Sequence, residues 1–193
     1  PDTPLVLMVR NDHPAKNVKD LYDFAKKNPD QVFMGNAGLG SSSHLIAALV
    51  ANAAGADVKH VPYKGAGPAL IDVVGGQIDG MYDQTNTAFP QITEKRVRAL
   101  AVTSKNRLPQ LKDVPTLNET ILPGFEASTW YGIYAPKGTP KAAVEKMQNA
   151  FLKAMKDKAY TDKLQSQAIQ LLPEQQYLGA SLAKHIEAEV ARW

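Results

Sequence analysis

A short apolar run that ends in a polar or glycine-rich turn, followed by a helix-length segment, recurs along the first half of the chain. These runs occupy residues 32–34, 58–61 and 78–82, and a further apolar run spans residues 97–103. Regular alternation of strands and helices is typical of α/β layer folds. The sequence therefore predicts an α/β fold with a mainly parallel sheet, in which ligands bind at the carboxyl ends of the strands.

The turn after residues 32–34 carries the clearest local signal for a binding loop. Gly35, Gly38 and Gly40 are followed by consecutive serines and by a helix expected over residues 42–54. Serine is a preferred N-cap residue, and a helix N-terminus combines unpaired N–H groups with the positive end of the helix dipole. The pattern predicts an anion-binding loop, although glycine also serves in such turns merely to join a strand to a helix.

Phosphate and dinucleotide binding are not predicted for this loop. No Gly-Lys-Ser/Thr follows the glycines, and their spacing differs from the G-x-G-x-x-G fingerprint. Two other polar turns, at residues 62–67 and 83–87, also follow expected strands. Because ligands of open α/β sheets bind outside the carboxyl ends of the strands, the clustering expected of these turns favours a binding site.

Composition excludes several classes of function. The chain has 193 residues with 22 Lys+Arg and 19 Asp+Glu, and the basic residues are dispersed, so nucleic acid is not an expected partner. Cysteine is absent, which excludes disulfides and thiolate metal ligands. His13, His44, His60 and His185 lack the spacing of a helical zinc site, and neither a metal nor a cofactor is predicted.

The segments outside this alternation predict further elements. An apolar run at residues 5–9 suits a strand that is buried on both faces in a parallel sheet. Asn17 is placed to cap a helix. The expected buried stripe of that helix consists of Val18, Leu21, Tyr22 and Ala25.

The second half of the chain follows a different pattern. Residues 105–124 are expected to form an irregular connection, and residues 130–136 another strand. Thr139 is the expected N-cap of the next helix, with Pro140 at its first position, and a last helix is expected over residues 173–193. These helices have apolar faces to bury, but few strands remain to receive them.

A set of short motifs runs in order from Leu5 to the end of the chain. They are Gly35-Asn36-Ala37-Gly38, Ser41-Ser42-Ser43-His44-Leu45, His60-Val61-Pro62-Tyr63-Lys64-Gly65-Ala66-Gly67-Pro68-Ala69, Gly76-Gln77-Ile78-Asp79, Arg98-Ala99-Leu100-Ala101-Val102-Thr103, Asp113-Val114-Pro115-Thr116, Trp130-Tyr131-Gly132 and Ala135-Pro136-Lys137-Gly138-Thr139-Pro140. The set closely resembles the solute receptors of tripartite tricarboxylate transporters, called Bug proteins. Val-Pro-Tyr-Lys-Gly is its most specific member.

The resemblance implies a type II periplasmic-binding-protein fold, in which two α/β lobes joined by two crossover strands close on a ligand. It further implies a periplasmic receptor, and not an enzyme, that binds a small organic acid. Such a receptor delivers its ligand to the membrane permease subunits of the transporter.

The same resemblance implies how the chain divides. Residues 9–130 correspond to a complete lobe two, while residues 1–8 and 131–193 correspond to crossover strands and the C-terminal remainder of lobe one. Family members begin with a signal peptide and the first part of lobe one, which this sequence does not contain. We therefore expect a truncated or nicked receptor, or one segment of a longer polypeptide, in which a missing N-terminal segment or self-association completes lobe one.

The turns and the resemblance together give a set of candidate ligand-binding residues. Serines of the first loop are expected to bind through hydroxyls and backbone amides, with pure helix capping as the alternative, and Tyr63 either closes over the ligand or packs in the core. Asp83 is expected to accept a hydrogen bond from a hydroxyl, an amine or water, since a bare carboxylate would be repelled. The candidates are Asn36, Ala37, Gly38, Ser41, Ser42, Ser43, His44, Tyr63, Asp83 and Thr85.

Two other functions compete with the receptor interpretation. The serines, His44 and Asp83 contain the side-chain types of a serine hydrolase, but His44 is expected in the first turn of the serine helix and no G-x-S-x-G elbow is present. An effector-binding domain of a transcription regulator would share the two-lobed architecture. The Val-Pro-Tyr-Lys-Gly motif favours the receptor over both.

Overall fold

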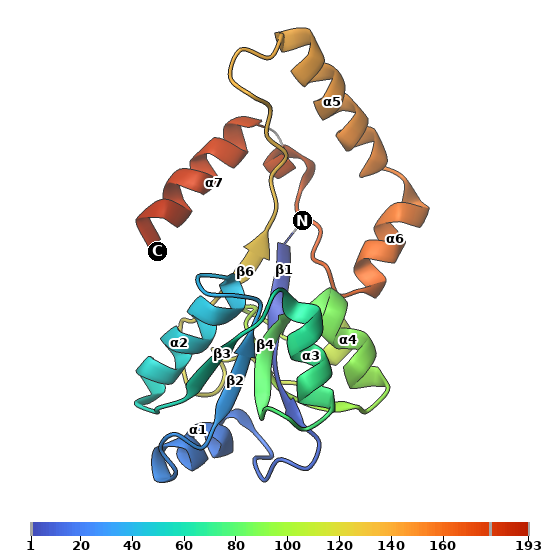
Figure 1. Cartoon of the computed structure of the whole chain (residues 1–193). Coiled ribbons are helices and arrows are strands. Elements are labelled where there is room, and N and C mark those ends of the chain that lie inside the picture. The colour runs from blue at the N-terminus through green and yellow to red at the C-terminus, as the bar shows by residue number, and fades with distance from the viewer. Residues whose placement is uncertain (1, 178, 193) are drawn as a thin grey trace. The chain divides into compact units, whose positions relative to one another are not determined.

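The helices and strands of the computed structural model gather into two compact units (Figure 1). The structure describes residues 2–177 and 179–192. Residues 3–129 form the first unit, here called the sheet unit. The second unit, here called the helical unit, consists of Asp2 and the described residues from 130 to 192. All the candidate ligand-binding residues lie in the sheet unit.

The sheet has the strand order β3-β2-β4-β1-β5, and β6 also pairs with β1. β2 (Phe33–Asn36) lies between β3 (Lys59–Pro62) and β4 (Gly80–Gln84) and is parallel to both. The carboxyl ends of these three strands therefore lie at the same edge of the sheet. This mixed arrangement confirms the predicted α/β class.

β1 (Asp2–Arg10) runs antiparallel to both of its long neighbours, β4 and β5 (Val97–Val102). The expectation that residues 5–9 lie in a parallel arrangement is therefore wrong. Residues 3–9 are buried along the whole run. Burial on both faces requires the same continuous apolar run whatever the direction of the neighbouring strands, so the pattern predicts burial and not polarity. β6 (Ser128–Trp130) pairs with the same strand.

Local capping signals fix the helix boundaries near the sheet. α1 (Val18–Lys27) begins after Asn17, whose side chain accepts a hydrogen bond from the backbone N–H of Asp20 (2.9 Å). α2 (Ser42–Ala54) ends at Gly55, which has the left-handed φ of 64° that favours glycine. Both boundaries are as predicted. The predicted stripe of α1 is buried as well: Val18, Leu21, Tyr22 and Ala25.

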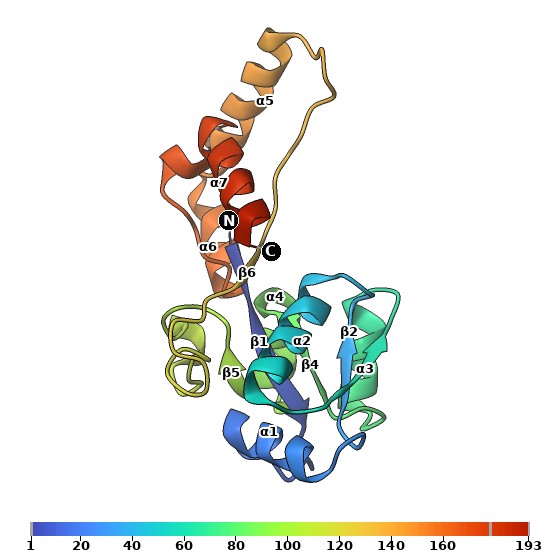
Figure 2. The same ribbon diagram turned by 90° about the vertical axis from the view of Figure 1, so that its left-hand side faces the viewer.

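α2 and α3 (Ala66–Val74) lie on opposite faces of the sheet (Figures 1 and 2). Met34 of β2 shares a buried core with residues of α1 and α2. The next residue, Gly35, faces α3, because a Cβ built on it would lie 3.3 Å from Cβ of Ala69. α4 (Thr85–Thr93) begins directly after β4, so that one helix starts at the carboxyl end of each of β2, β3 and β4.

The connection from β5 to β6 is irregular, as predicted, with one short 3₁₀ helix at Pro109–Leu111. Thr103 lies at its start and is fully buried. Its hydroxyl accepts a hydrogen bond from the N–H of Leu5 (2.8 Å) and donates one to the carbonyl of Ala127 (2.7 Å). This single hydroxyl thereby joins β1, β5 and the segment that leads into β6.

The helical unit contains α5 (Lys141–Ala154), α6 (Lys158–Ser166), a 3₁₀ helix at Glu174–Tyr177 and α7 (Gly179–Arg192). α6 was not predicted. The last helix was expected over residues 173–193, of which 178 and 193 lie outside the described residues. α5 and α6 bury no residue, in line with the expected shortage of strands.

Two predictions for the start of this unit are wrong. The predicted strand over residues 130–136 ends at Trp130, and the proposed crossover strand at 131–135 is not a strand. Its aromatic and β-branched residues suit a strand, but β propensity produces one only where a neighbouring strand pairs with it. Thr139 is not the N-cap of α5: its hydroxyl donates to the carbonyl of Pro136 (2.8 Å), and Pro140 is the N-cap residue.

The two units meet between residues 129 and 130, and residues 3–8 belong to the sheet unit. The reason is that β1 pairs with β4 from Leu5 and with β5 from Val6. Within the described residues, no helix is both long and apolar enough to cross a membrane.

A buried histidine lies between β1 and α1. His13 is 1% exposed, and its Nδ1 accepts a hydrogen bond from the N–H of Ala15 (3.1 Å). Its Nε2 has no hydrogen-bond partner among the described residues and lies 3.9 Å from Oδ1 of Asp79. Burial lowers the pKa of His13, an effect that Arg10 and Arg98 reinforce and the carboxylates of Asp79 and Asp12 oppose.

We expect this histidine to make the fold less stable in mild acid. Because the folded-state pKa is below the unfolded value, His13 takes up a proton in the unfolded chain first, and stability present at neutral pH is lost as the pH falls below that value. In His13→Asn, the side-chain oxygen can still accept from Ala15. Urea unfolding at pH 7.5 and 5.5 should show a smaller difference in the free energy of unfolding for this variant than for the wild type.

His185→Asn, at an exposed position of α7, is the matched control and should keep the wild-type difference. His60 also has a pKa lowered by burial and remains in both variants. The variant difference therefore isolates His13. Equal pH differences in wild type and His13→Asn would contradict the assignment.

Candidate functional site

The three polar turns converge at the carboxyl edge of the sheet, as predicted. The first turn lies against the second, because the N–H of Gly65 donates to the carbonyl of Ala37 (3.2 Å). The third follows β4, which pairs with β2. α2, α3 and α4 begin at this edge (Figure 1). Each helix N-terminus contributes positive potential there.

The loop of residues 36–44 uses most of its own N–H groups, contrary to the expectation that it presents them freely. The N–H of Gly38 donates to Oδ1 of Asn36 (3.1 Å), and that of Ala37 to Oγ of Ser43 (2.9 Å). The N–H of Gly40 donates to Nδ1 of His44 (3.2 Å). Gly38 and Gly40 have φ of 125° and 78°, which other residues rarely adopt. The sequence pattern could not show these bonds, since they depend on the folded path of the loop.

The serines of this loop differ in role. Ser41 is the N-cap of α2: its Oγ accepts from the N–H of His44 (3.3 Å) and donates to the carbonyl of Gly38 (2.7 Å). Ser43 is 6% exposed, and its Oγ lies 3.0 Å from that of Ser41. Ser42 is exposed. Among the described residues, its hydroxyl and the N–H groups of Ser42 and Ser43 have no hydrogen-bond partner, so they are available to an anion.

Two buried amide groups at this edge carry unused hydrogen-bonding capacity. Asn36 is fully buried, and its Nδ2 has no partner among the described residues. Asn86, in the first turn of α4, is half-buried, and its buried Oδ1 also has no partner among the described residues. An unpaired buried polar group costs about 1–3 kcal/mol. These atoms are therefore positioned to bind a polar group of a ligand.

Tyr63 is tied to α3. Its hydroxyl donates to Oδ2 of Asp72 (2.7 Å). Burial and the neighbouring Asp72 carboxylate raise the pKa of Tyr63 to about 12, so the phenol remains protonated and able to donate. Movement of Tyr63 over a ligand would break this bond.

Asp83 is 2% exposed and organises the start of α4. Its Oδ1 accepts from the N–H of Gln84 (2.8 Å), and its Oδ2 accepts from the hydroxyl of Thr87 (2.7 Å). Burial raises the pKa of Asp83, while the bonds from Thr87 and Gln84 oppose the shift. Thr85 is also fully buried. Asp83 and Thr85 are therefore buried parts of the third turn, and the hydrogen bonds of Asp83 stabilise its conformation.

His44 contacts a residue that the sequence pattern missed. Its ring meets that of His60 edge to face, with centroids 5.1 Å apart. His60 lies opposite Met34 in the pairing of β3 with β2, and therefore on the α2 face of the sheet. This contact could not be found from local sequence, because only the pairing of β3 with β2 brings His60 against His44. Asn86 was not among the candidates either, although it lies in the third polar turn that the sequence pattern assigns to this edge.

The hydrolase alternative finds no support in this arrangement. Nδ1 of His44 accepts from a backbone N–H, and Asp83 binds Thr87 and Gln84, so the three side-chain types do not form a relay. Among the described residues, no group of three or more histidine or carboxylate side chains is placed to hold a metal ion.

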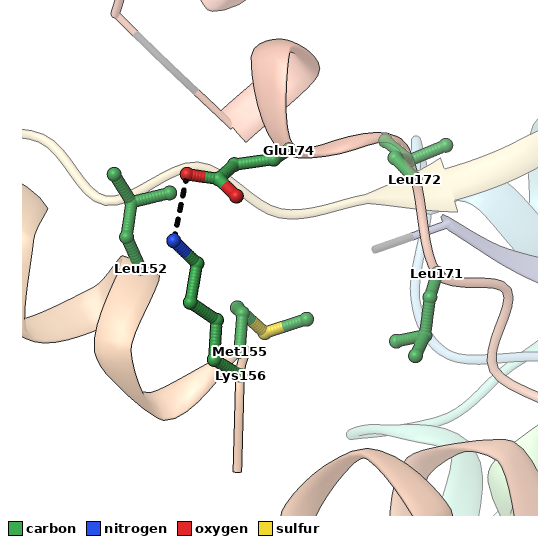
Figure 3. Close-up of a pocket in the computed structure, with 6 residues that line it drawn as sticks. All are labelled: Leu152, Met155, Lys156, Leu171, Leu172 and Glu174. Carbon is green, nitrogen blue, oxygen red and sulfur yellow. Dashed lines mark ion pairs between the residues drawn. The ribbon is translucent and has the colours of Figure 1, made fainter. Parts of the chain in front are cut away.

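A separate hollow of about 120 Å³ lies within the helical unit (Figure 3). Nζ of Lys156 and Oε1 of Glu174 form an ion pair across it at 3.2 Å. Its remaining lining is apolar and comprises Leu152, Met155, Leu171 and Leu172. None of the candidate ligand-binding residues lines this hollow.

Comparison with known proteins identifies the family. The sequence model of the tripartite tricarboxylate transporter family receptor, TctC, matches residues 1–193. A UPF0065 protein from the tcbD-tcbE intergenic region of Pseudomonas sp. (strain P51) is 45% identical over 153 residues, which is 79% of this chain and 46% of that protein. The chain thus spans about half the length of this curated relative.

Comparison with solved structures leads to the same family. The periplasmic binding protein BugD matches 100% of this chain and 64% of its own length, with a TM-score of 0.94 and 36% identity. MatC from Rhodopseudomonas palustris with bound malate matches 100% of this chain and 65% of its own length, with a TM-score of 0.94 and 32% identity. These findings confirm the resemblance and the binding-protein fold class. The chain belongs to the TctC family of tripartite tricarboxylate transporter receptors.

Proposed function

We propose that this chain forms part of a periplasmic solute receptor that binds a small carboxylate and delivers it to the permease subunits of a tripartite tricarboxylate transporter. One observation carries the proposal: Asn36, whose buried Nδ2 has no partner among the described residues, ends β2 directly before the loop that leads into α2. The similarity to a malate-bound receptor supports a carboxylate as the ligand.

The site binds its ligand with neutral donors. The N–H groups of Ser42 and Ser43, the hydroxyl of Ser42 and Nδ2 of Asn36 can each donate to a carboxylate oxygen. The dipole of α2 supplies further favourable potential. None of the candidate residues is a lysine or arginine, so hydrogen bonding and helix dipoles take the place of an ion pair.

We further propose that the sheet unit is lobe two and that the helical unit is the remainder of lobe one. A segment of the same polypeptide that precedes residue 1 then completes lobe one. The exposed apolar side chains of the helical unit support this arrangement, since Met147 is 61% and Val190 75% exposed. Alternatively, a second copy of the chain covers these apolar side chains. Native mass spectrometry distinguishes the preceding segment from a second copy.

Asn36→Asp tests the binding site. The new carboxylate keeps an oxygen that accepts from the N–H of Gly38, but it replaces the Nδ2 donor with a negatively charged acceptor. We expect the dissociation constant for a bound carboxylate to rise by about 10- to 100-fold. The measurement is isothermal titration calorimetry at pH 7.5, with the protein as its gene encodes it and with malate and other linear mono- and dicarboxylates.

Asn118→Asp is the matched control. Asn118 also accepts from a backbone N–H, that of Gly124 (2.7 Å), and lies in the irregular connection of the sheet unit. It should leave carboxylate affinity unchanged. Absence of binding to every carboxylate tested, or equal affinities for wild type and Asn36→Asp, would refute the proposed site.

A further inference from the structure

The binding loop contains one ionisable side chain in an otherwise uncharged stretch. Between Asp30 and Asp57, His44 is the only residue with an acidic or basic side chain. It occupies the first turn of α2. A positive charge is unfavourable at that end of a helix, because the helix dipole is positive there.

The hydrogen bond between His44 and Gly40 requires an unprotonated Nδ1. This nitrogen accepts from the N–H of Gly40 at 3.2 Å, and a ring nitrogen can accept only while it carries no proton. The donor belongs to the glycine with φ of 78° that precedes the N-cap Ser41. The imidazole therefore closes the turn whose next residues offer their N–H groups to an anion.

His60 is the titratable group that contacts His44. Burial and the nearby His44 lower the pKa of His60, while Asp57 opposes the shift. Two lysines flank His60 in sequence, and both are exposed: Lys59, which forms an ion pair with Asp30, and Lys64. No carboxylate contacts the His44 ring among the described residues.

We propose that His44 is a positioning residue that makes ligand binding depend on pH. Its neutral imidazole holds Gly40, and so fixes the loop of residues 36–44 in the conformation that binds a carboxylate. Protonation of Nδ1 turns the acceptor into a donor that faces the N–H of Gly40, which opens the turn and weakens binding. This regulation rests on the function proposed above, while the hydrogen bond itself is a property of the unliganded chain.

The first arm of the test needs no ligand. In ¹⁵N-labelled protein, the amide resonance of Gly40 should shift between pH 7.5 and 5.5 with the same midpoint as the imidazole resonances of His44. In His44→Asn the side-chain oxygen replaces Nδ1 as the acceptor and does not titrate, so the Gly40 shift should disappear. A Gly40 resonance that does not follow His44 would overturn the proposal, whether or not a ligand is known.

The second arm compares affinities for malate, or for the tightest carboxylate found at pH 7.5. The dissociation constant of the wild type should rise about tenfold between pH 7.5 and 5.5 relative to that of His44→Asn. Protonation of the ligand cancels in this comparison, because it is common to both proteins. If the dissociation constant changes between pH 7.5 and 5.5 by the same factor in the wild type and in His44→Asn, the proposal is overturned.

His60→Asn is the matched control for the neighbouring ring. Its dissociation constants at pH 5.5 and 7.5 should have the same ratio as those of the wild type. Loss of this ratio in His60→Asn would assign the effect to His60 and overturn the role of His44. Circular dichroism at both pH values shows that each variant is folded. If no carboxylate binds while the Gly40 shift still follows His44, the proposed function fails and the hydrogen-bond switch stands.

Discussion

Replacing Gly80 with alanine should lower the free energy of unfolding by about 3 kcal/mol or more, a loss at the upper end of the range for overpacking. A Cβ on Gly80 would lie 2.4 Å from the carbonyl oxygen of Met8 and 3.0 Å from Cγ1 of Val9. The first clash is with backbone, so no change of side-chain rotamer relieves it. β1 would have to move away from β4 in the middle of the sheet.

Gly67→Ala is the matched control. Gly67 lies in the first turn of α3, and no atom comes within 4 Å of a Cβ built on it. Alanine favours the helical conformation over glycine, so this variant should be more stable than the wild type by about 0.5–1 kcal/mol. Urea unfolding followed by circular dichroism measures both. Equal stability of Gly80→Ala and wild type would show that β1 and β4 lie farther apart than described.

Thr103→Val should cost about 2–4 kcal/mol, because it leaves two buried backbone groups without a partner. Valine has nearly the shape of threonine but no hydroxyl. The N–H of Leu5 would lose its acceptor, and the carbonyl of Ala127 would lose its donor. Leu5, Thr103 and Ala127 are each at most 2% exposed, so water cannot replace the hydroxyl without opening the sheet.

Thr103→Ser separates the hydroxyl from the methyl group. Serine keeps both hydrogen bonds and loses one buried methyl, so its cost should be closer to 1 kcal/mol. The two variants are compared with the wild type by urea unfolding at pH 7.5. If valine proves no more destabilising than serine, the hydroxyl is not what joins the three segments.

The parts of the fold that local chemistry specifies could be predicted from the sequence. Asn17 caps α1, and Gly55 ends α2, because a side-chain oxygen or a left-handed φ acts within a few residues of its own position. The alternation of apolar runs and polar turns likewise predicted that the three polar turns meet at the carboxyl edge of β2, β3 and β4. Those signals need no knowledge of distant partners.

What could not be predicted depends on contacts between distant residues. The direction of β1 follows from its pairing with β4 and β5, and residues 131 to 136 form no strand although their composition suits one. At the site, the His44–His60 contact arises only because β3 pairs with β2. The unused Nδ2 of Asn36 is visible only once every nearby acceptor has been placed.

The position of β1 also determines when the sheet can form during synthesis. Leu5 pairs with Gln84, and Val6 pairs with Val102, so the apolar strand is made long before either neighbour leaves the ribosome. Loop closure over such separations is slow, and an unpaired apolar strand invites aggregation in the meantime. The nascent chain therefore has no strand partner for β1 until β4 has been translated, and the second long neighbour follows only with β5.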